Sequence, residues 1–190
     1  MREMEEKILR EGEVLPGDIL KVGSFLNQNI DTDFLGCMAQ EIARLFEGRG
    51  VTKILTIEAS GIAIAAAAGM SMGVPVLFAK KHRTSNVDGS VYTAVVHSFT
   101  HNEDYNVVVS RDYLTDGDRV LLVDDFLASG NALRGLMKLC EQAHAELVGM
   151  AVAVEKCFSG AGDAFRAQGI QVESLAAIES MSEDGIVFRS

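Results

Sequence analysis

The sequence predicts an α/β fold, with a mostly parallel, twisted sheet flanked by helices. Short apolar runs alternate with segments of helical periodicity, which is typical of βαβ crossovers. The apolar runs are nearly continuous, which indicates strands covered on both faces. In such a sheet, ligands bind beyond the carboxyl ends of the strands. The segments expected there are 58–61, 80–90, 124–131 and 155–160.

The first part of the chain predicts two helices around an irregular segment. Residues 2–11 alternate charged and apolar side chains at helical spacing. Residues 14–30 contain Pro, Gly and several amides and are expected to be irregular. Residues 33–47 have apolar side chains at helical intervals, and Asp31 or Asp33 can cap this helix.

The rest of the chain alternates between the two periodicities. The predicted strands are 53–57, 74–79, 91–98, 105–110, 119–123, 147–155 and 171–177. The predicted helices are 61–72, 129–143 and 162–168. Two of the strands, 91–98 and 105–110, are expected to form a hairpin-like pair. Residues 80–90 are polar and predict a loop.

Composition limits the possible classes of protein. Of the 190 residues, 48% are hydrophobic and 23% are charged, which is typical of a globular chain and excludes disorder. A single domain over residues 1–190 is expected at this length. There are 17 basic and 27 acidic residues, a net charge of −10, which argues against free nucleic acid as a partner.

Cysteines and the N-terminus predict a cytoplasmic protein without a membrane span. The three cysteines, Cys37, Cys140 and Cys157, are widely spaced with no C-x-x-C, so we interpret them as reduced. The first seven residues are charged and contain no apolar core of a signal peptide. The longest apolar run, 62–70, is far shorter than the roughly 20 residues that a bilayer span needs.

Residues 120–132 contain the most informative pattern. An apolar strand ends in two adjacent carboxylates, Asp124 and Asp125, and a short loop leads to a helix start with Ser129 and Gly130. A helix N-terminus with small residues exposes backbone N–H groups to an anion. Adjacent carboxylates can accept hydrogen bonds from two vicinal hydroxyls. Together these parts suit a ribose 5-phosphate. The alternative interpretation is that the carboxylates only cap or solvate a loop.

The same segment matches neither a P-loop nor a dinucleotide-binding fingerprint. It resembles the motif with which the type I phosphoribosyltransferases bind 5-phosphoribosyl 1-diphosphate (PRPP). Residues 56–63 resemble the pyrophosphate loop of that family. Residues 20–27 and 154–158 resemble the base-binding parts of a bacterial branch that acts on xanthine. The resemblance covers essentially the whole chain.

The resemblance implies both a fold and a reaction. The fold is the type I phosphoribosyltransferase fold, with a small hood built from the N-terminal region, about residues 1–30, and C-terminal segments. The reaction, a step of purine salvage, transfers the 5-phosphoribosyl group of PRPP to xanthine and gives XMP and pyrophosphate. Mg²⁺ is expected, bound mainly through substrate oxygens and water, so no protein metal site is predicted. A homodimer is also implied.

The resemblance assigns roles to residues at the predicted strand ends. Asp124 and Asp125 would contact the ribose hydroxyls and stabilise positive charge that develops on the sugar. Ser60 and Gly61 would bind pyrophosphate, in a loop that can hold a strained non-proline peptide bond. Lys81 would close over the pyrophosphate, with Lys80 and Arg83 beside it. The 5-phosphate would be bound by Ala128, Ser129, Gly130, Asn131 and Ala132. Without the resemblance, 58–61 is equally well a plain strand-to-helix turn. The basic run 80–83 is then more often a solvated surface loop.

Three residues are expected to contact the purine. Lys156 can only donate hydrogen bonds, so it suits a 6-oxopurine rather than adenine. Asn27 could donate to a 2-oxo group or accept from a 2-amino group. Leu20 would supply backbone polar groups and an apolar wall. Phe126 and Phe158 could enclose the ring or belong to the core.

One position departs from the hypoxanthine-guanine branch of the family. Where Ala128 stands, that branch has an aspartate that can take a proton from the base, so no general base is visible here. Xanthine is more acidic than guanine, and we hypothesise that an anionic xanthine needs less help. Two alternatives remain open: a preference for guanine or hypoxanthine, and a non-catalytic regulator that binds PRPP.

Overall fold

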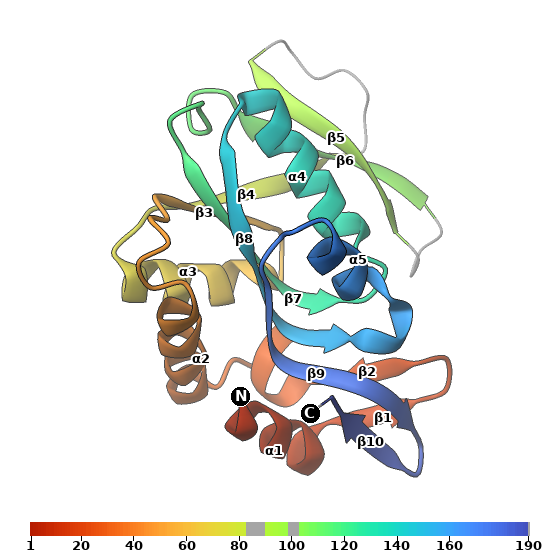
Figure 1. Cartoon of the computed structure of the whole chain (residues 1–190). Helices are drawn as coiled ribbons and strands as arrows, with labels where there is room; N and C mark the ends of the chain where they lie inside the picture. The colour runs from red at the N-terminus through yellow and green to blue at the C-terminus, as the bar shows by residue number, and fades with distance from the viewer. Residues whose placement is uncertain (83–89, 99–102, 190) are drawn as a thin grey trace.

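The computed structural model describes residues 1–82, 90–98 and 103–189 and centres on an eight-stranded sheet. The strand order is β10-β9-β8-β7-β3-β4-β6-β5, and the five strands from β9 to β4 are parallel (Figure 1). β10, β6 and β5 pair antiparallel at the two edges. The strands are β3 (Lys53–Ile57), β4 (Val76–His82), β5 (Val91–Ser98), β6 (Glu103–Ser110), β7 (Arg119–Leu127), β8 (Glu146–Lys156), β9 (Val172–Ser182) and β10 (Gly185–Phe188).

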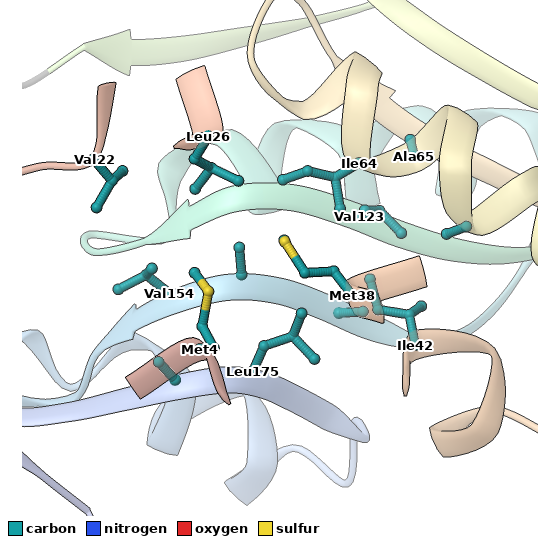
Figure 2. Close-up of a cluster of buried hydrophobic side chains, with 14 of the residues drawn as sticks. Met4, Val22, Leu26, Met38, Ile42, Ile64, Ala65, Val123, Val154 and Leu175 are labelled. Carbon is teal, nitrogen blue, oxygen red and sulfur yellow. The ribbon is translucent and has the colours of Figure 1, made fainter. Parts of the chain in front are cut away.

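Helices cover both faces of the sheet, as the continuous apolar strands predicted. They are α1 (Arg2–Glu11), α2 (Thr32–Leu45), α3 (Gly61–Met72), α4 (Asn131–Ala143) and α5 (Ala161–Ala167). Successive residues of β7 point to opposite faces: Leu121 and Val123 pack in one apolar cluster with α2 and α3, while Leu122 packs in the other with α4 and α5. Figure 2 shows the first cluster, in which Val123 and Val154 project from neighbouring strands.

The N-terminal segment folds against the C-terminal strands. The short strands β1 (Glu13–Leu15) and β2 (Ile19–Lys21) pair antiparallel, and a π-helical turn spans Gly23–Asn27. The Met1 amino group donates to the Leu175 carbonyl oxygen of β9 at 2.5 Å. α1, β1, β2 and β10 therefore gather at one end of the molecule, where both termini lie (Figure 1). This arrangement agrees with the implied hood.

Asp31, rather than Asp33, caps α2. Its Oδ1 accepts a hydrogen bond from the Phe34 backbone N–H at 3.0 Å. Its other carboxylate oxygen accepts from the Lys7 ammonium of α1 at 2.7 Å. Asp31 therefore joins the N-terminal helix to the helical layer.

Several predicted bounds were wrong. Residues 14–30 are not irregular throughout, because they contain the β1–β2 hairpin. β4 continues through Lys80 and Lys81, which pair with Val108 and Val107 of β6, so the predicted loop begins later. β9 runs five residues further than predicted, to Ser182, and its pairing with β10 was not anticipated. In each case, pairing with another strand overrides weak local propensity, and for β4 that strand is distant in the sequence.

The same effect changes the segment after residue 123. A loop was predicted there, but β7 continues to Leu127, because Asp124, Phe126 and Leu127 pair with β8. α4 begins at Asn131, two residues later than predicted. Among the described residues, no helix is long and apolar enough to cross a membrane.

Candidate active site

The carboxyl ends of β3, β4, β7 and β8 meet at one edge of the sheet, because these strands are parallel. Two helices begin there: α3 directly after the 58–60 turn and α4 after the 128–130 turn. Helix N-termini present free backbone N–H groups to anions. The edge therefore combines two anion-binding helix ends with the carboxylates of β7.

Asp124 and Asp125 have different surroundings. Asp124 is buried, with 4% of its surface exposed, whereas Asp125 is half-buried. The Asp125 backbone N–H donates to Asp124 Oδ1 at 2.9 Å, and the Phe126 N–H donates to Asp125 Oδ1 at 3.0 Å. Burial, followed by the charge of Asp125, raises the pKa of Asp124 well above its ordinary value. The two carboxylates thus differ in burial and in hydrogen-bond partners.

Side chains from three other elements surround Asp124. A Cβ on Gly61 would lie 3.0 Å from Asp124 Oδ1 and 2.3 Å from Thr56 Oγ1, so the first residue of α3 must be small. The Lys81 ammonium acts to lower the pKa of Asp124. It also lies 5.3 Å from the centre of the Tyr105 ring, and burial and the charge of Asp124 raise the pKa of Tyr105.

The predicted phosphate loop is a tight turn with its N–H groups at the start of α4. Gly130 has φ 77°, a left-handed conformation that favours glycine, and a Cβ there would contact Ala161 at 3.0 Å. The Asn131 side chain donates to the His97 carbonyl at 3.1 Å, which ties the loop to β5. Ser129 lies half-buried beside it. Ala128 and Ala132 complete the turn and the first helical residues.

The predicted pyrophosphate loop follows β3. The peptide bond between Glu58 and Ala59 is cis, in the loop for which the resemblance implied an unusual peptide bond. The Glu58 carboxylate accepts from the Lys81 backbone N–H at 2.6 Å, so this loop and the end of β4 are joined. Ser60 lies at the N-cap of α3 and Gly61 is its first residue. Arg83 lies outside the described residues.

Lys156 and Phe126 lie together at the edge where the base contacts were predicted. The Lys156 ammonium lies 5.5 Å from the centre of the Phe126 ring and donates to the Asp18 carbonyl of the β1–β2 turn at 2.7 Å. Burial lowers the pKa of Lys156. The hairpin of the N-terminal segment therefore contacts the end of β8 directly.

The other predicted base contacts differ in exposure. Leu20 is a buried residue of β2, and its side chain belongs to the core cluster with α1 and β9. Asn27 is exposed at the end of the π-helical turn. Phe158 is exposed in the short 3₁₀ turn Cys157–Ser159 that follows Lys156.

Sequence reasoning missed a buried ion pair behind this turn. Glu155, 1% exposed, accepts from Arg166 at 2.8 and 2.6 Å and also from the Ser174 hydroxyl. Burial raises the pKa of Glu155, but these hydrogen bonds outweigh it and leave the pKa below its ordinary value. A charged residue at the end of the predicted strand 147–155 was the available signal, since a buried charge requires a partner.

The site also suits the implied magnesium ion. Mg²⁺ prefers oxygen ligands and keeps several waters, so substrate phosphates can supply much of its coordination. Within the described residues no group of three or more His, Cys, Asp or Glu side chains could hold a metal ion. The two helix N-termini and the Lys81 ammonium instead suit the diphosphate that would bring the ion.

Comparison with known proteins identifies the class. The family model for the phosphoribosyl transferase domain matches residues 30–163. The chain belongs to the phosphoribosyltransferase family. Its curated relatives include the xanthine phosphoribosyltransferase of Bifidobacterium adolescentis, 50% identical over all of both chains. The protein of the same name from Lactiplantibacillus plantarum is 44% identical over all of this chain and 97% of its own.

Solved structures share the fold at low identity. Adenine phosphoribosyltransferase from Trypanosoma brucei has a TM-score of 0.74 and 17% identity, over 92% of this chain and 79% of that chain. The enzyme from Rhodothermus marinus has a TM-score of 0.72 and 17% identity, over 93% and 99%. The fold is therefore the mostly parallel phosphoribosyltransferase sheet that the sequence predicted.

Proposed function

We propose that this chain is a xanthine phosphoribosyltransferase, which transfers the 5-phosphoribosyl group of PRPP to xanthine and gives XMP and pyrophosphate. The convergence of the Asp124–Asp125 pair, the α4 N-terminus and Lys156 at one sheet edge is the observation that supports it best. The choice of xanthine is supported by relatives of that name, 44–52% identical over nearly the whole chain.

PRPP would bind across the two helix N-termini. Backbone N–H groups of 128–132 and the Ser129 hydroxyl would hold the 5-phosphate. Ser60, Gly61 and Lys81 would bind the diphosphate. Charge on the departing diphosphate is offset further when Mg²⁺ is bound.

Transfer needs a positively charged sugar to be stabilised. A purine nitrogen forms a bond to C1 of the ribose, the bond from C1 to the diphosphate oxygen breaks, and the nitrogen loses its proton. Asp124 and Asp125 would accept hydrogen bonds from the ribose hydroxyls and face the developing charge. With alanine at position 128, the proton would leave most readily from an acidic base such as xanthine.

The base would lie beside the Lys156–Phe126 wall. Lys156 would donate to the 6-oxo group, Asn27 to the 2-oxo group, and Leu20 would provide backbone polar groups. Phe126 and Phe158 would contact the ring faces.

The test is nucleotide formation from PRPP and Mg²⁺ with xanthine, guanine, hypoxanthine and adenine in parallel. We expect the fastest turnover with xanthine and none with adenine, and a xanthine-to-guanine rate ratio that increases toward mildly alkaline pH. Faster turnover of guanine or hypoxanthine would show that the preferred substrate is that purine and not xanthine. No product from any base, with PRPP binding intact, would favour a regulator.

We also propose a cytoplasmic homodimer that folds as one domain over residues 1–190, because the resemblance implies this assembly. Light scattering of the purified chain would measure a mass near twice its 20.4 kDa. A mass of one chain at micromolar concentration would contradict the dimer.

A further inference from the structure

Thr56 has a buried hydroxyl that no described residue contacts by a hydrogen bond. The residue lies in β3, one position before its end, and none of its surface is exposed. Its Oγ1 is buried and has no hydrogen-bond partner within the described part of the chain. A buried hydroxyl without a partner destabilises a fold, so valine, which has the same shape, would serve the core better. Packing alone therefore does not explain why a threonine, rather than a valine, stands at this position.

The hydroxyl points toward the candidate active site. A Cβ placed on Gly61 would lie 2.3 Å from Thr56 Oγ1 and 3.0 Å from Asp124 Oδ1. Both oxygens therefore approach the same point above the first residue of α3, and only a glycine leaves that space open. A hydroxyl donates and a carboxylate accepts, so a hydrogen bond between these two groups across this space would be chemically matched. A carboxylate oxygen can accept this bond in addition to the one from the Asp125 N–H.

A donated hydrogen bond would affect Asp124 strongly, because its carboxylate is buried. The charged and titratable groups that face it are Asp125 on its own strand, Lys81 of β4 and Tyr105 of β6. Burial and Asp125 favour its protonated form, and Lys81 opposes them. A hydroxyl that donates to the carboxylate favours the ionised form. The ionised form is the one that can stabilise a cationic sugar.

We propose that Thr56 is a positioning residue: its hydroxyl donates a hydrogen bond to the Asp124 carboxylate in the reacting complex and keeps that group ionised and aimed at the ribose. This inference rests on the proposed function, which places the ribose of PRPP at Asp124. Thr56 itself touches no substrate. It acts only through the carboxylate.

Two substitutions separate this role from packing. Thr56→Val removes the hydroxyl and keeps the shape, whereas Thr56→Ser keeps the hydroxyl and removes a buried methyl group. Thr56→Val should be at least as stable as the wild type, with kcat about 10- to 100-fold lower, the range expected for a hydrogen bond to a charged group. Thr56→Ser should be less stable yet keep kcat within about threefold of the wild type. Thr52→Val is the matched control, because the Thr52 hydroxyl accepts from the Arg119 N–H before β3 begins.

The measurements are steady-state kinetics with PRPP and xanthine against pH, and chemical denaturation of the full chain. In Thr56→Val the acidic limb of kcat should move to higher pH, with the KM for xanthine unchanged. Wild-type kcat and pH profile in Thr56→Val would overturn the proposal. So would a kcat that follows stability across both variants, or a Thr56→Val protein that is less stable than the wild type. An inactive wild type would instead contradict the proposed function.

Discussion

The Ser159 hydroxyl oxygen lies 2.5 Å from the carbonyl oxygen of Ala128 and 2.6 Å from that of Lys156. Ala128 begins the proposed phosphate loop and Lys156 is the proposed base contact, so one side chain connects the two halves of the site. A hydroxyl has a single proton and donates to one of these carbonyls at a time. The contact sets the spacing between the 128–130 turn and the turn that follows β8.

Ser159→Ala should lower kcat about 2- to 10-fold, the range expected for one neutral hydrogen bond. The KM for each substrate should change less, because each half of the site stays intact while their relative position loosens. Steady-state kinetics measures both quantities. Ser182→Ala is the control: it removes a hydroxyl that accepts from the Asp184 N–H in the β9–β10 turn, which contains no residue assigned to the site, and should leave kcat unchanged. Equal effects of the two substitutions would show that the contact has no special role.

Lys156→Met should raise the KM for xanthine about tenfold or more, because a charge-assisted hydrogen bond is lost while the aliphatic stem is largely retained. The KM for PRPP should stay within about twofold. Lys138→Met, at an exposed position of α4, is the control for loss of a positive charge. An unchanged KM for xanthine would show that Lys156 does not contact the base.

Gly162→Ala should destabilise the fold by roughly 3 kcal/mol or more, since separating a buried ion pair is costly. A Cβ at this position would lie 1.9 Å from Glu155 Oε1 and 2.9 Å from the Arg166 guanidinium. Gly36→Ala in α2 is the matched control, because nothing lies within 4 Å of its Cβ. That substitution should stabilise the helix by about 0.5–1 kcal/mol. Urea denaturation measures both, and a tolerated Gly162→Ala would show that the pair can rearrange freely.

Asp31→Asn should make the free energy of unfolding less dependent on pH in the acidic range. The hydrogen bond from Lys7, followed by that from the Phe34 N–H, lowers the pKa of Asp31. A carboxyl with a lowered pKa contributes stability above its ordinary pKa of about 3.9, and that contribution is lost as pH falls through the lowered value. Asparagine still caps α2 but cannot pair as an anion with Lys7.

The free energy of unfolding should therefore be lower for Asp31→Asn at pH 7, and the difference should shrink as pH falls below about 4. Denaturant titrations at several pH values measure it. A difference that stays constant with pH would mean that the Lys7 pairing does not contribute.

Much of the fold could be predicted because the signals are local. Residues 53–57 form β3 with the predicted bounds, since a short apolar run covered on both faces has few other solutions. The antiparallel pairing of 91–98 with the following strand was also confirmed. The proposed ribose-binding segment could be named from the sequence because its two carboxylates are adjacent in the chain and follow an apolar strand.

Bounds failed where pairing with a distant strand decided the structure. Lys80 and Lys81 favour a loop locally, yet β6 pairs with them. Asp124 to Leu127 continue β7 because β8 lies alongside. A local sequence pattern reflects backbone preference and burial. It carries no information about a partner strand that lies tens of residues away in the chain.

By itself the sequence determined the class of fold and, through a resemblance, the family, and it supplied the segment that we propose binds phosphate. Only the tertiary structure decided which side chains surround Asp124, and it placed Thr56, Lys81 and Tyr105 there from three different strands. The physical reason is that strand order and register set these contacts. Order and register result from the packing of the whole sheet, so no short segment of the chain encodes them.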